Sequence, residues 1–228
     1  MLLQVENLEV KYGNIQALHG ISFHVNEGEI VTLIGANGAG KTTSLYSITR
    51  LPPPEAPRVV GGDIKFMGES ILKAKPSDVV KKMNLALSPE GRRIFGNLSV
   101  MENLKLATYS REKDADLEAE YERIFDLFPR LKERRTQRSE SLSGGEQQML
   151  TIARTLMGNP EMIILDEPSE GLAPVIVDQL ADTIQTLKDK GVSILLAEQN
   201  LNFAKYIWDR DYIIYQGCVS QESAIDTV

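Results

Sequence analysis

The sequence predicts an α/β fold with a mixed sheet, an N-terminal antiparallel β subdomain and an inserted helical subdomain. Three observations lead to this prediction. Residues 1–35 alternate apolar and polar side chains, as strands do. Later apolar runs end in glycine-rich or acidic turns before helical patterns, which indicates parallel strands with helices between them. Residues 89–157 are mainly helical, so we expect residues 1–88 and 158–228 to form one core around this insertion.

The N-terminal strands are predicted from alternating apolar residues, and the turn Asn26-Glu27-Gly28 leads into the next strand. The alternating residues are Leu3, Val5, Leu8 and Val10, then Ile21, Phe23 and Val25. Tyr12 lies between two of these strands. Its ring is either a half-buried side chain at a strand end or an aromatic face for a nucleobase, and the spacing alone favours neither.

A glycine-rich segment, GANGAGKTT at residues 35–43, connects the predicted strand 30–34 to a predicted helix over residues 41–50. In this context it predicts a phosphate-binding loop, because glycines let backbone N–H groups approach phosphate oxygens. Lys41 is expected to reach the β- and γ-phosphates and the Thr42 hydroxyl to hold Mg²⁺. The flanking strand and helix disfavour the alternative, a glycine-rich turn with a surface lysine. The predicted nucleotide-binding residues are Gly35, Asn37, Gly38, Ala39, Gly40, Lys41, Thr42 and Thr43.

The next segment begins with Pro52-Pro53-Pro54, which ends the helix. We expect a surface connection over residues 51–62 and a short strand at residues 63–66. A turn or helix start is expected at residues 75–78, and a buried strand at residues 85–87.

Within the insertion, apolar residues recur at steps of three and four along an otherwise charged segment, which predicts one amphipathic helix. These residues are Leu117, Tyr121, Ile124, Phe128 and Leu131. The charged run at residues 132–138 is interpreted as a solvated surface.

The segment LSGGEQ at residues 142–147 opens a further predicted helix, which ends at Gly158-Asn159-Pro160. Ser143 and Glu146 have the spacing of a capping box. A plain capped helix would explain this pattern. Gly144 and Gly145 also leave the helix start without side chains, so its N–H groups could meet an anion.

An apolar strand at residues 162–165 ends in Asp166 and Glu167. Because parallel sheets bind ligands at the carboxyl ends of their strands, we expect Asp166 to reach Mg²⁺ through water. Glu167 is expected to orient or deprotonate an attacking water, although a simple acidic turn is the alternative. The remaining predicted elements are a helix from Pro174 towards Gly191, a strand over residues 192–197 followed by Glu198-Gln199-Asn200, and strands around residues 212–219.

The composition limits the class of protein. The 25 basic and 32 acidic residues give a formal charge of −7, which argues against a broad electrostatic grip on nucleic acid. The single cysteine, Cys218, cannot form an internal disulfide and indicates a reducing compartment. No apolar run approaches the roughly 20 residues of a membrane span, and the first residues lack a basic signal-peptide region. We therefore expect a cytoplasmic protein whose membrane role, if any, needs partner subunits.

The ordered set of phosphate loop, LSGGEQ and Asp-Glu strand resembles the nucleotide-binding subunit of ABC transporters over essentially the whole chain. LSGGEQ carries most of the specificity, because many NTPases share the other two motifs. The closer resemblance is to ATPases of branched-chain amino acid importers, and urea-type importers look similar. It rests on PEGRRIF at residues 89–95, LSGGEQQML at 142–150, DEPSEGLAP at 166–174 and AEQN at 197–200.

The resemblance implies a P-loop NTPase core, ATP and Mg²⁺ as cofactors, and a head-to-tail dimer. Each ATP would lie between the phosphate loop of one subunit and the signature motif of the other. Carried over to this chain, the resemblance implies that Lys41, Glu167 and Gln199 act in catalysis and that Tyr12 stacks on adenine. It places Thr42, Asp166 and Glu90 at the metal. The signature residues that would contact the partner's nucleotide are Ser143, Gly144, Gly145 and Glu146.

Three positions depart from the general family pattern. Most members have Gln where this chain has Glu90 and His where it has Gln199, and residues 169–172 lack the usual aspartate. We expect Mg²⁺ or a neighbouring arginine, Arg92 or Arg93, to offset the charge of Glu90. Gln199 can donate a hydrogen bond to a γ-phosphate but cannot carry a proton, so Glu167 is expected to activate the water.

The partners implied by the resemblance are hydrophobic permease subunits, which the helical insertion would face, and an external solute-binding protein. A second ATPase subunit, preferably a related chain and otherwise a second copy, would complete the dimer. The chain would then be peripheral to the inner face of the cell membrane. The alternatives are an importer ATPase for urea or another small polar solute, and a soluble ABC ATPase not tied to transport.

Overall fold

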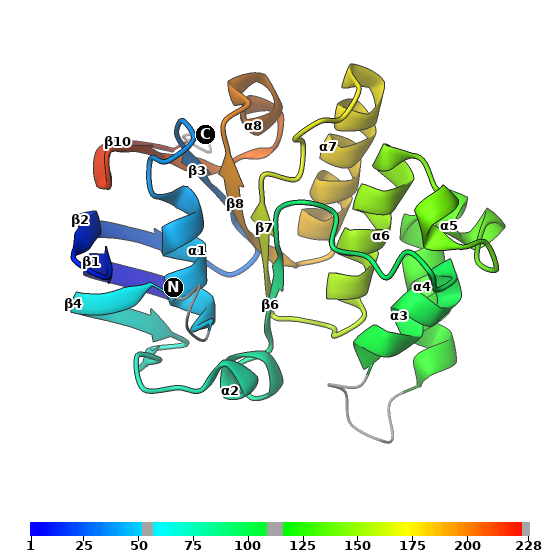
Figure 1. Cartoon of the computed structure of the whole chain (residues 1–228), viewed down its shortest axis with the longest axis horizontal. Helices are drawn as coiled ribbons and strands as arrows, with labels where there is room; N and C mark the ends of the chain where they lie inside the picture. Colours follow the sequence, from blue (N-terminus) through cyan, green and yellow to red (C-terminus); the bar gives the residue numbers. More distant parts are fainter. Residues whose placement is uncertain (52–56, 109–115, 225–228) are drawn as a thin grey trace.

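The computed structural model describes residues 1–51, 57–108 and 116–224 and contains two sheets with helices around them (Figure 1). The smaller sheet is antiparallel and has the strand order β2-β1-β4-β5. Its strands are β1 (Leu3–Tyr12), β2 (Ile15–Val25), β4 (Arg58–Phe66) and β5 (Glu69–Ser70). The predicted N-terminal antiparallel β subdomain is therefore confirmed.

The larger sheet has six strands in the order β10-β9-β3-β8-β7-β6. These are β3 (Ile30–Ile34), β6 (Leu85–Ser88), β7 (Met162–Asp166), β8 (Ser193–Glu198), β9 (Arg210–Tyr215) and β10 (Cys218–Ala224). All neighbours are parallel except β9 and β10, so the sheet is mixed, as predicted. Every residue of β3, β7 and β8 is buried, which explains why the sequences of these strands are mainly apolar.

Two apolar cores cover the two faces of the larger sheet. Helix α1 (Lys41–Thr49) lies between the two sheets and contributes Leu45 and Ile48 to the first core. The second core contains residues of α6 (Gly144–Leu156), α7 (Pro174–Asp189) and α8 (Leu201–Ile207). Leu195 faces the first core and Leu196 the second, because successive side chains of a strand point to opposite faces.

The insertion also packs into the second core. Its helices are α3 (Val100–Ala107), α4 (Leu117–Leu127), α5 (Pro129–Glu133) and α6, and a 3₁₀ turn, η2 (Ser139–Ser141), precedes α6. The short helix α2 (Pro76–Lys81) lies outside the insertion and precedes β6. Tyr121 and Ile124 belong to the same apolar cluster as Ile163 of β7, so the described helices pack against the sheet and share its core. In Figure 1 they lie at the end of the molecule opposite the smaller sheet.

Two element predictions were wrong. The single amphipathic helix over residues 117–131 is broken at Phe128, because Pro129 starts α5 and cannot continue α4. Strand β4 begins at Arg58, inside the expected connection. A β-carbon on Gly62 would lie 2.3 Å from the carbonyl oxygen of Asn7, so glycine lets β4 pair closely with β1 where no apolar alternation marks a strand. The three prolines at 52–54 lie outside the described residues.

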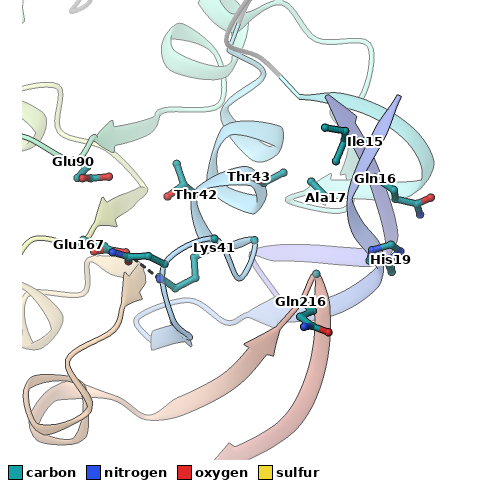
Figure 2. A pocket seen from close by; sticks show the side chains of 14 residues that line it. Ile15, Gln16, Ala17, His19, Lys41, Thr42, Thr43, Glu90, Glu167 and Gln216 are labelled. Carbon is teal, nitrogen blue, oxygen red and sulfur yellow. Dashed lines mark ion pairs between the residues drawn. The ribbon is translucent and has the colours of Figure 1, made fainter. Parts of the chain in front are cut away.

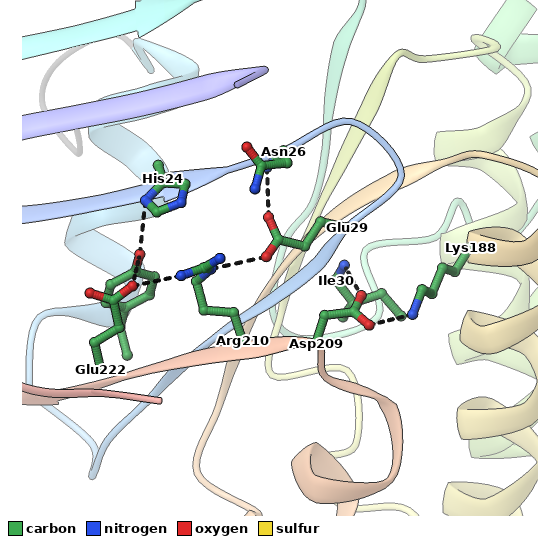
Figure 3. A network of polar contacts seen from close by, with 9 residues as sticks. His24, Asn26, Glu29, Ile30, Lys188, Asp209, Arg210 and Glu222 are labelled. Carbon is green, nitrogen blue, oxygen red and sulfur yellow. Dashed lines mark hydrogen bonds and ion pairs between the residues drawn. The ribbon is translucent and has the colours of Figure 1, made fainter. Parts of the chain in front are cut away.

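A polar network fastens the edge of the larger sheet to the smaller one (Figure 3). The hydroxyl of Tyr212 donates to Oε1 of Glu222 at 3.0 Å and lies 3.1 Å from Nδ1 of His24 on β2. Arg210 joins Oε1 of Glu29 at 2.9 Å to Oε1 of Glu222 at 2.7 Å. His24 is thus a structural residue.

Candidate active site

The glycine-rich loop connects the carboxyl end of β3 to the start of α1. Gly38 and Gly40 have φ angles of 78° and 115°, which L side chains rarely adopt. A β-carbon on Gly35 would lie 2.5 Å from the carbonyl oxygen of Ile214. Gly40 caps α1 without a side-chain hydrogen bond, so the first N–H groups of this helix face the loop without a side-chain acceptor. This is the arrangement that binds a phosphate group.

A cleft of about 510 Å³ opens beside this loop (Figure 2). Its lining includes Asn37, Gly38, Gly40, Lys41, Thr42, Thr43, Glu90 and Glu167, as well as Ile15, Gln16, Ala17, His19, Gln216 and Gly217. The last six were not predicted as site residues. They reach the cleft because the β9–β10 turn packs against β2 and the loop: the N–H of Gly217 donates to Ala39 and that of His19 to Gly217, both at 2.8 Å. The sequence carries no local signal for this contact.

Lys41 is buried and its ammonium group is fully engaged. Nζ donates to the carbonyl oxygens of Gly35 at 2.7 Å and Ala36 at 3.1 Å. It also forms an ion pair of 3.0 Å with Oε1 of Glu167. The predicted phosphate-binding lysine and the predicted general base are therefore in contact.

Asp166 and Thr42, two of the predicted metal ligands, are in contact with each other. The Thr42 hydroxyl donates to Oδ1 of Asp166 at 3.2 Å, whereas the buried Oδ2 has no protein partner. Burial, with smaller contributions from Glu90 and Glu167, raises the pKa of Asp166 to about 6, although the hydrogen bond from Thr42 opposes this. An orphaned carboxylate oxygen beside a hydroxyl suits Mg²⁺, which commonly combines one or two carboxylates with substrate phosphates. Among the described residues, no group of three or more His, Cys, Asp or Glu could hold a metal alone.

Glu167 sits in an unusual backbone conformation, with a φ angle of 46°. Its N–H donates to the carbonyl oxygen of Ala197 on β8 at 2.9 Å. Nε2 of Gln199 donates to Oε2 of Glu167 at 3.3 Å. A strained backbone held on both sides fixes the carboxylate at the end of the cleft, and such strain clusters at functional sites. Gln199 thus acts on the candidate base from an exposed position outside the cleft lining.

Glu90 lines the same cleft from the segment after β6 (Figure 2). Burial, the charges of Glu170 and Glu167, and a hydrogen bond with Glu170 raise its pKa, while the charge of Arg93 lowers it. Of the two arginines expected to offset the charge of Glu90, Arg93 is the one whose charge acts on it. The other, Arg92, donates instead to the carbonyl oxygen of Gly171 at 3.0 Å.

Glu198 is a site residue that the sequence reasoning passed over. It is buried at the end of β8 and accepts three backbone N–H groups, from Ser169 at 3.0 Å, Gln199 at 3.1 Å and Asn200 at 3.2 Å. Burial raises its pKa in spite of these hydrogen bonds. The carboxylate therefore ties the loop after Glu167 to the loop that carries Gln199. The signal that could have identified Glu198 is its position: an acidic residue at the end of a buried strand, directly before Gln199.

The signature segment lies apart from this cleft. Ser143 and Glu146 form the predicted capping box: the Ser143 hydroxyl accepts from the N–H of Glu146 at 3.3 Å, and Glu146 accepts from the N–H of Ser143 at 2.9 Å. Neither residue lines the cleft, nor do Gly144 and Gly145. A β-carbon on Gly145 would lie 2.6 Å from Cγ2 of Ile176, so this glycine lets α6 approach α7.

Tyr12 ends β1 with its side chain partly exposed and its hydroxyl donating to Oγ1 of Thr43 at 3.4 Å. The Tyr12 ring does not line the cleft. The cleft-lining residues closest to Tyr12 in the sequence are Ile15, Gln16 and Ala17. Both interpretations of Tyr12 stay predictions.

Comparison with known proteins agrees with this geometry. A sequence family described as ABC transporter matches residues 18–170. The chain belongs to the ABC transporter family. It is 44% identical, over 95% of its length and 90% of the relative, to the high-affinity branched-chain amino acid transport ATP-binding protein BraG of Pseudomonas aeruginosa. It is 32% identical, over 94% of its length and 87% of the relative, to the lipopolysaccharide export system ATP-binding protein LptB of Escherichia coli K12.

The fold of this ABC ATPase matches solved cassettes. The ADP conformation of an ATP-binding cassette of an ABC transporter superposes with a TM-score of 0.85 and 26% identity, covering 99% of this chain and 91% of that one. The prediction of an ATPase of this family is thereby confirmed. Within the described ranges no helix combines the length and apolar character needed to cross a membrane.

Proposed function

We propose that this ABC ATPase powers the import of branched-chain amino acids, with Mg²⁺ and ATP as cofactors. The observation that carries the chemistry is that Lys41, Thr42 and Glu167 line one cleft, with Asp166 hydrogen-bonded to Thr42 and Glu167 paired with Lys41. The similarity to BraG over nearly the whole chain supports the solute class. The metal set Thr42, Asp166 and Glu90, the adenine contact of Tyr12 and the role of Gln199 are part of this proposal.

Each residue has a defined role in hydrolysis. The loop N–H groups and Lys41 bind the phosphates, and Lys41 leaves Glu167 for the β- and γ-phosphates. Thr42 and Asp166, with Glu90 nearby, would hold Mg²⁺, which would neutralise phosphate charge. Glu167 accepts a proton from water, whose oxygen attacks the γ-phosphorus while the bond to the β–γ bridging oxygen breaks. ADP and phosphate then leave.

A second cassette completes the site in this proposal. Residues 143–146 lie outside the chain's own cleft, and in this proposal they contact the nucleotide of a partner ATPase, related or identical. Permease subunits would dock near the segment after β6, where the half-exposed ring of Phe95 is held 4.8 Å from Cζ of Arg154. The chain would then be cytoplasmic and peripheral to the membrane, and an external binding protein would deliver the solute.

The first experiment separates chemistry from transport. Purified wild-type chain should hydrolyse ATP only with Mg²⁺, and its rate per molecule should rise with protein concentration. Glu167→Gln should bind ATP without turnover and accumulate as a dimer in size-exclusion chromatography with light scattering. Brisk hydrolysis by Glu167→Gln would place the general base elsewhere.

The second experiment tests the solute. Deleting the chromosomal gene should abolish uptake of radiolabelled leucine at low external concentration, and wild type but not Glu167→Gln should restore it. Excess unlabelled valine or isoleucine should compete, whereas urea should not. Unchanged leucine uptake with lost urea uptake would favour the urea importer, and no transport defect would favour the soluble ATPase.

A further inference from the structure

Arg92 links parts of the chain that are far apart in sequence. It belongs to the connection between β6 and α3, which passes from the core to the helical subdomain (Figure 1). Its Nη2 donates to the carbonyl oxygen of Gly171 at 3.0 Å, in the loop that follows Glu167. On its other side the guanidinium covers Gly144, where a β-carbon would lie 2.5 Å from Nη1 and 3.1 Å from Cζ.

The local backbone is shaped for this reach. Gly91 and Arg92 have φ angles of 88° and 45°, so a non-glycine residue is held in the left-handed region. No carboxylate of the described ranges lies within ion-pair distance of Arg92. No described acidic side chain therefore holds the guanidinium in this position. Its described contacts are the carbonyl oxygen of Gly171 and the side-chain-free surface of Gly144.

We propose that Arg92 is a positioning residue that latches the helical subdomain to the α/β core. Gly144 starts the signature helix α6, whereas Gly171 belongs to the core, so the planar guanidinium spans the boundary between the two subdomains. The latch sets the angle at which residues 143–145 face a partner's nucleotide. This consequence rests on the proposed function, but the latch itself does not.

The direct test measures the orientation of the subdomains in the isolated, nucleotide-free chain. Spin labels on Ala119→Cys in α4 and Lys205→Cys in α8, both exposed, would report it by pulsed electron paramagnetic resonance in a Cys218→Ser background. The distance distribution should be narrow in this background and wider in Arg92→Ala. Arg92→Lys should also widen it, because an ammonium has no planar fork to cover Gly144 while donating to Gly171.

Two further variants sharpen the result. Gly144→Ala should widen the distribution by displacing the guanidinium, and should add nothing in Arg92→Ala. Arg93→Ala removes the same charge from the next position without the two contacts, so its distribution should stay narrow. A distribution of unchanged width in Arg92→Ala overturns the proposal, and so does equal widening in Arg93→Ala.

The functional consequence has its own readout. In Arg92→Ala, kcat should fall on the order of tenfold or more, because a small misplacement of a reacting group is costly. The affinity of the isolated chain for ATP and the unfolding temperature should stay unchanged. An unchanged kcat in Arg92→Ala overturns the inference that the latch sets the angle of residues 143–145. If wild type shows neither dimer nor turnover, the proposed function fails, while the label distances still decide the latch.

Discussion

The Nζ atom of Lys41 lies 3.0 Å from Oε1 of Glu167, and both side chains are more than 90% buried. In this arrangement each side chain neutralises the other in a site that water scarcely reaches. A buried charge that loses its partner is strongly destabilising. In the proposed hydrolysis, the phosphates of a bound nucleotide therefore replace Glu167 as the partner of Lys41 before that carboxylate acts on water.

The stability of the nucleotide-free protein should reflect this pair. Lys41→Met leaves the Glu167 carboxylate buried and unpaired and should cost about 3 kcal/mol of unfolding free energy. Glu167→Gln should cost less, because the Lys41 ammonium keeps two carbonyl acceptors. The double variant Lys41→Met/Glu167→Gln should be more stable than Lys41→Met alone, as measured by urea denaturation.

A matched control is the half-exposed pair of Lys65 with Glu6, whose Nζ–Oε2 distance is 2.8 Å. Lys65→Met should leave the denaturation midpoint nearly unchanged, because solvent screens this pair. Equal losses for Lys41→Met and the double variant would mean that Glu167 is not the group left unpaired.

Gln199 should affect turnover more than nucleotide binding. Its Nε2 donates to Glu167 at 3.3 Å and thereby orients the carboxylate. Gln199→Ala should lower kcat about tenfold while KM for ATP changes by less than about twofold, because loose orientation slows the chemical step. Steady-state kinetics at saturating Mg²⁺ give both constants. A rise in KM with unchanged kcat would instead place Gln199 on the substrate.

Most of the fold and the centre of the site could be predicted because their signals are local. The glycine loop needs backbone angles that glycine adopts far more readily than other residues, and the buried strands β3, β7 and β8 need mainly apolar sequences. The capping box of Ser143 and Glu146 is likewise written within four residues. Such constraints can be seen in one stretch of sequence.

The parts that escaped prediction depend on contacts between distant segments. His19 and Gln216 reach the cleft only because a turn between β9 and β10 packs against β2 and the loop. The pairing of β4 with β1 at Gly62 requires the partner strand to be known. Glu167 has a positive φ where β7 ends and its N–H donates to the carbonyl oxygen of Ala197. A glutamate in the sequence gives no indication of such a backbone angle.

Glu198 should prove necessary for both stability and activity. Its carboxylate accepts three N–H groups from two loops, and an amide nitrogen in its place cannot accept. Glu198→Gln should therefore cost about 2 kcal/mol of unfolding free energy and slow hydrolysis, because a buried N–H loses its acceptor. Glu161→Gln, at an exposed position, is the matched control and should change neither quantity. Wild-type stability in Glu198→Gln would show that these hydrogen bonds contribute little.

Tyr212 should make the stability of the protein sensitive to alkaline pH. Burial and the neighbouring Glu222 raise the pKa of this phenol to about 12. The unfolded chain then loses the proton near pH 10, whereas the folded chain retains it until about pH 12. The folded state binds the proton more tightly, so this stabilisation is complete below pH 10 and is lost as the pH rises through 12.

The comparison that isolates this effect is the difference in unfolding free energy between wild type and Tyr212→Phe. Tyr212→Phe also loses the hydrogen bond to Glu222 and should be less stable near pH 8. Between pH 9 and 12 the difference should shrink by about 2 to 3 kcal/mol, the free energy that corresponds to this change in pKa. A constant difference for Tyr212→Phe would show that the phenol ionises equally readily in the folded and unfolded chains.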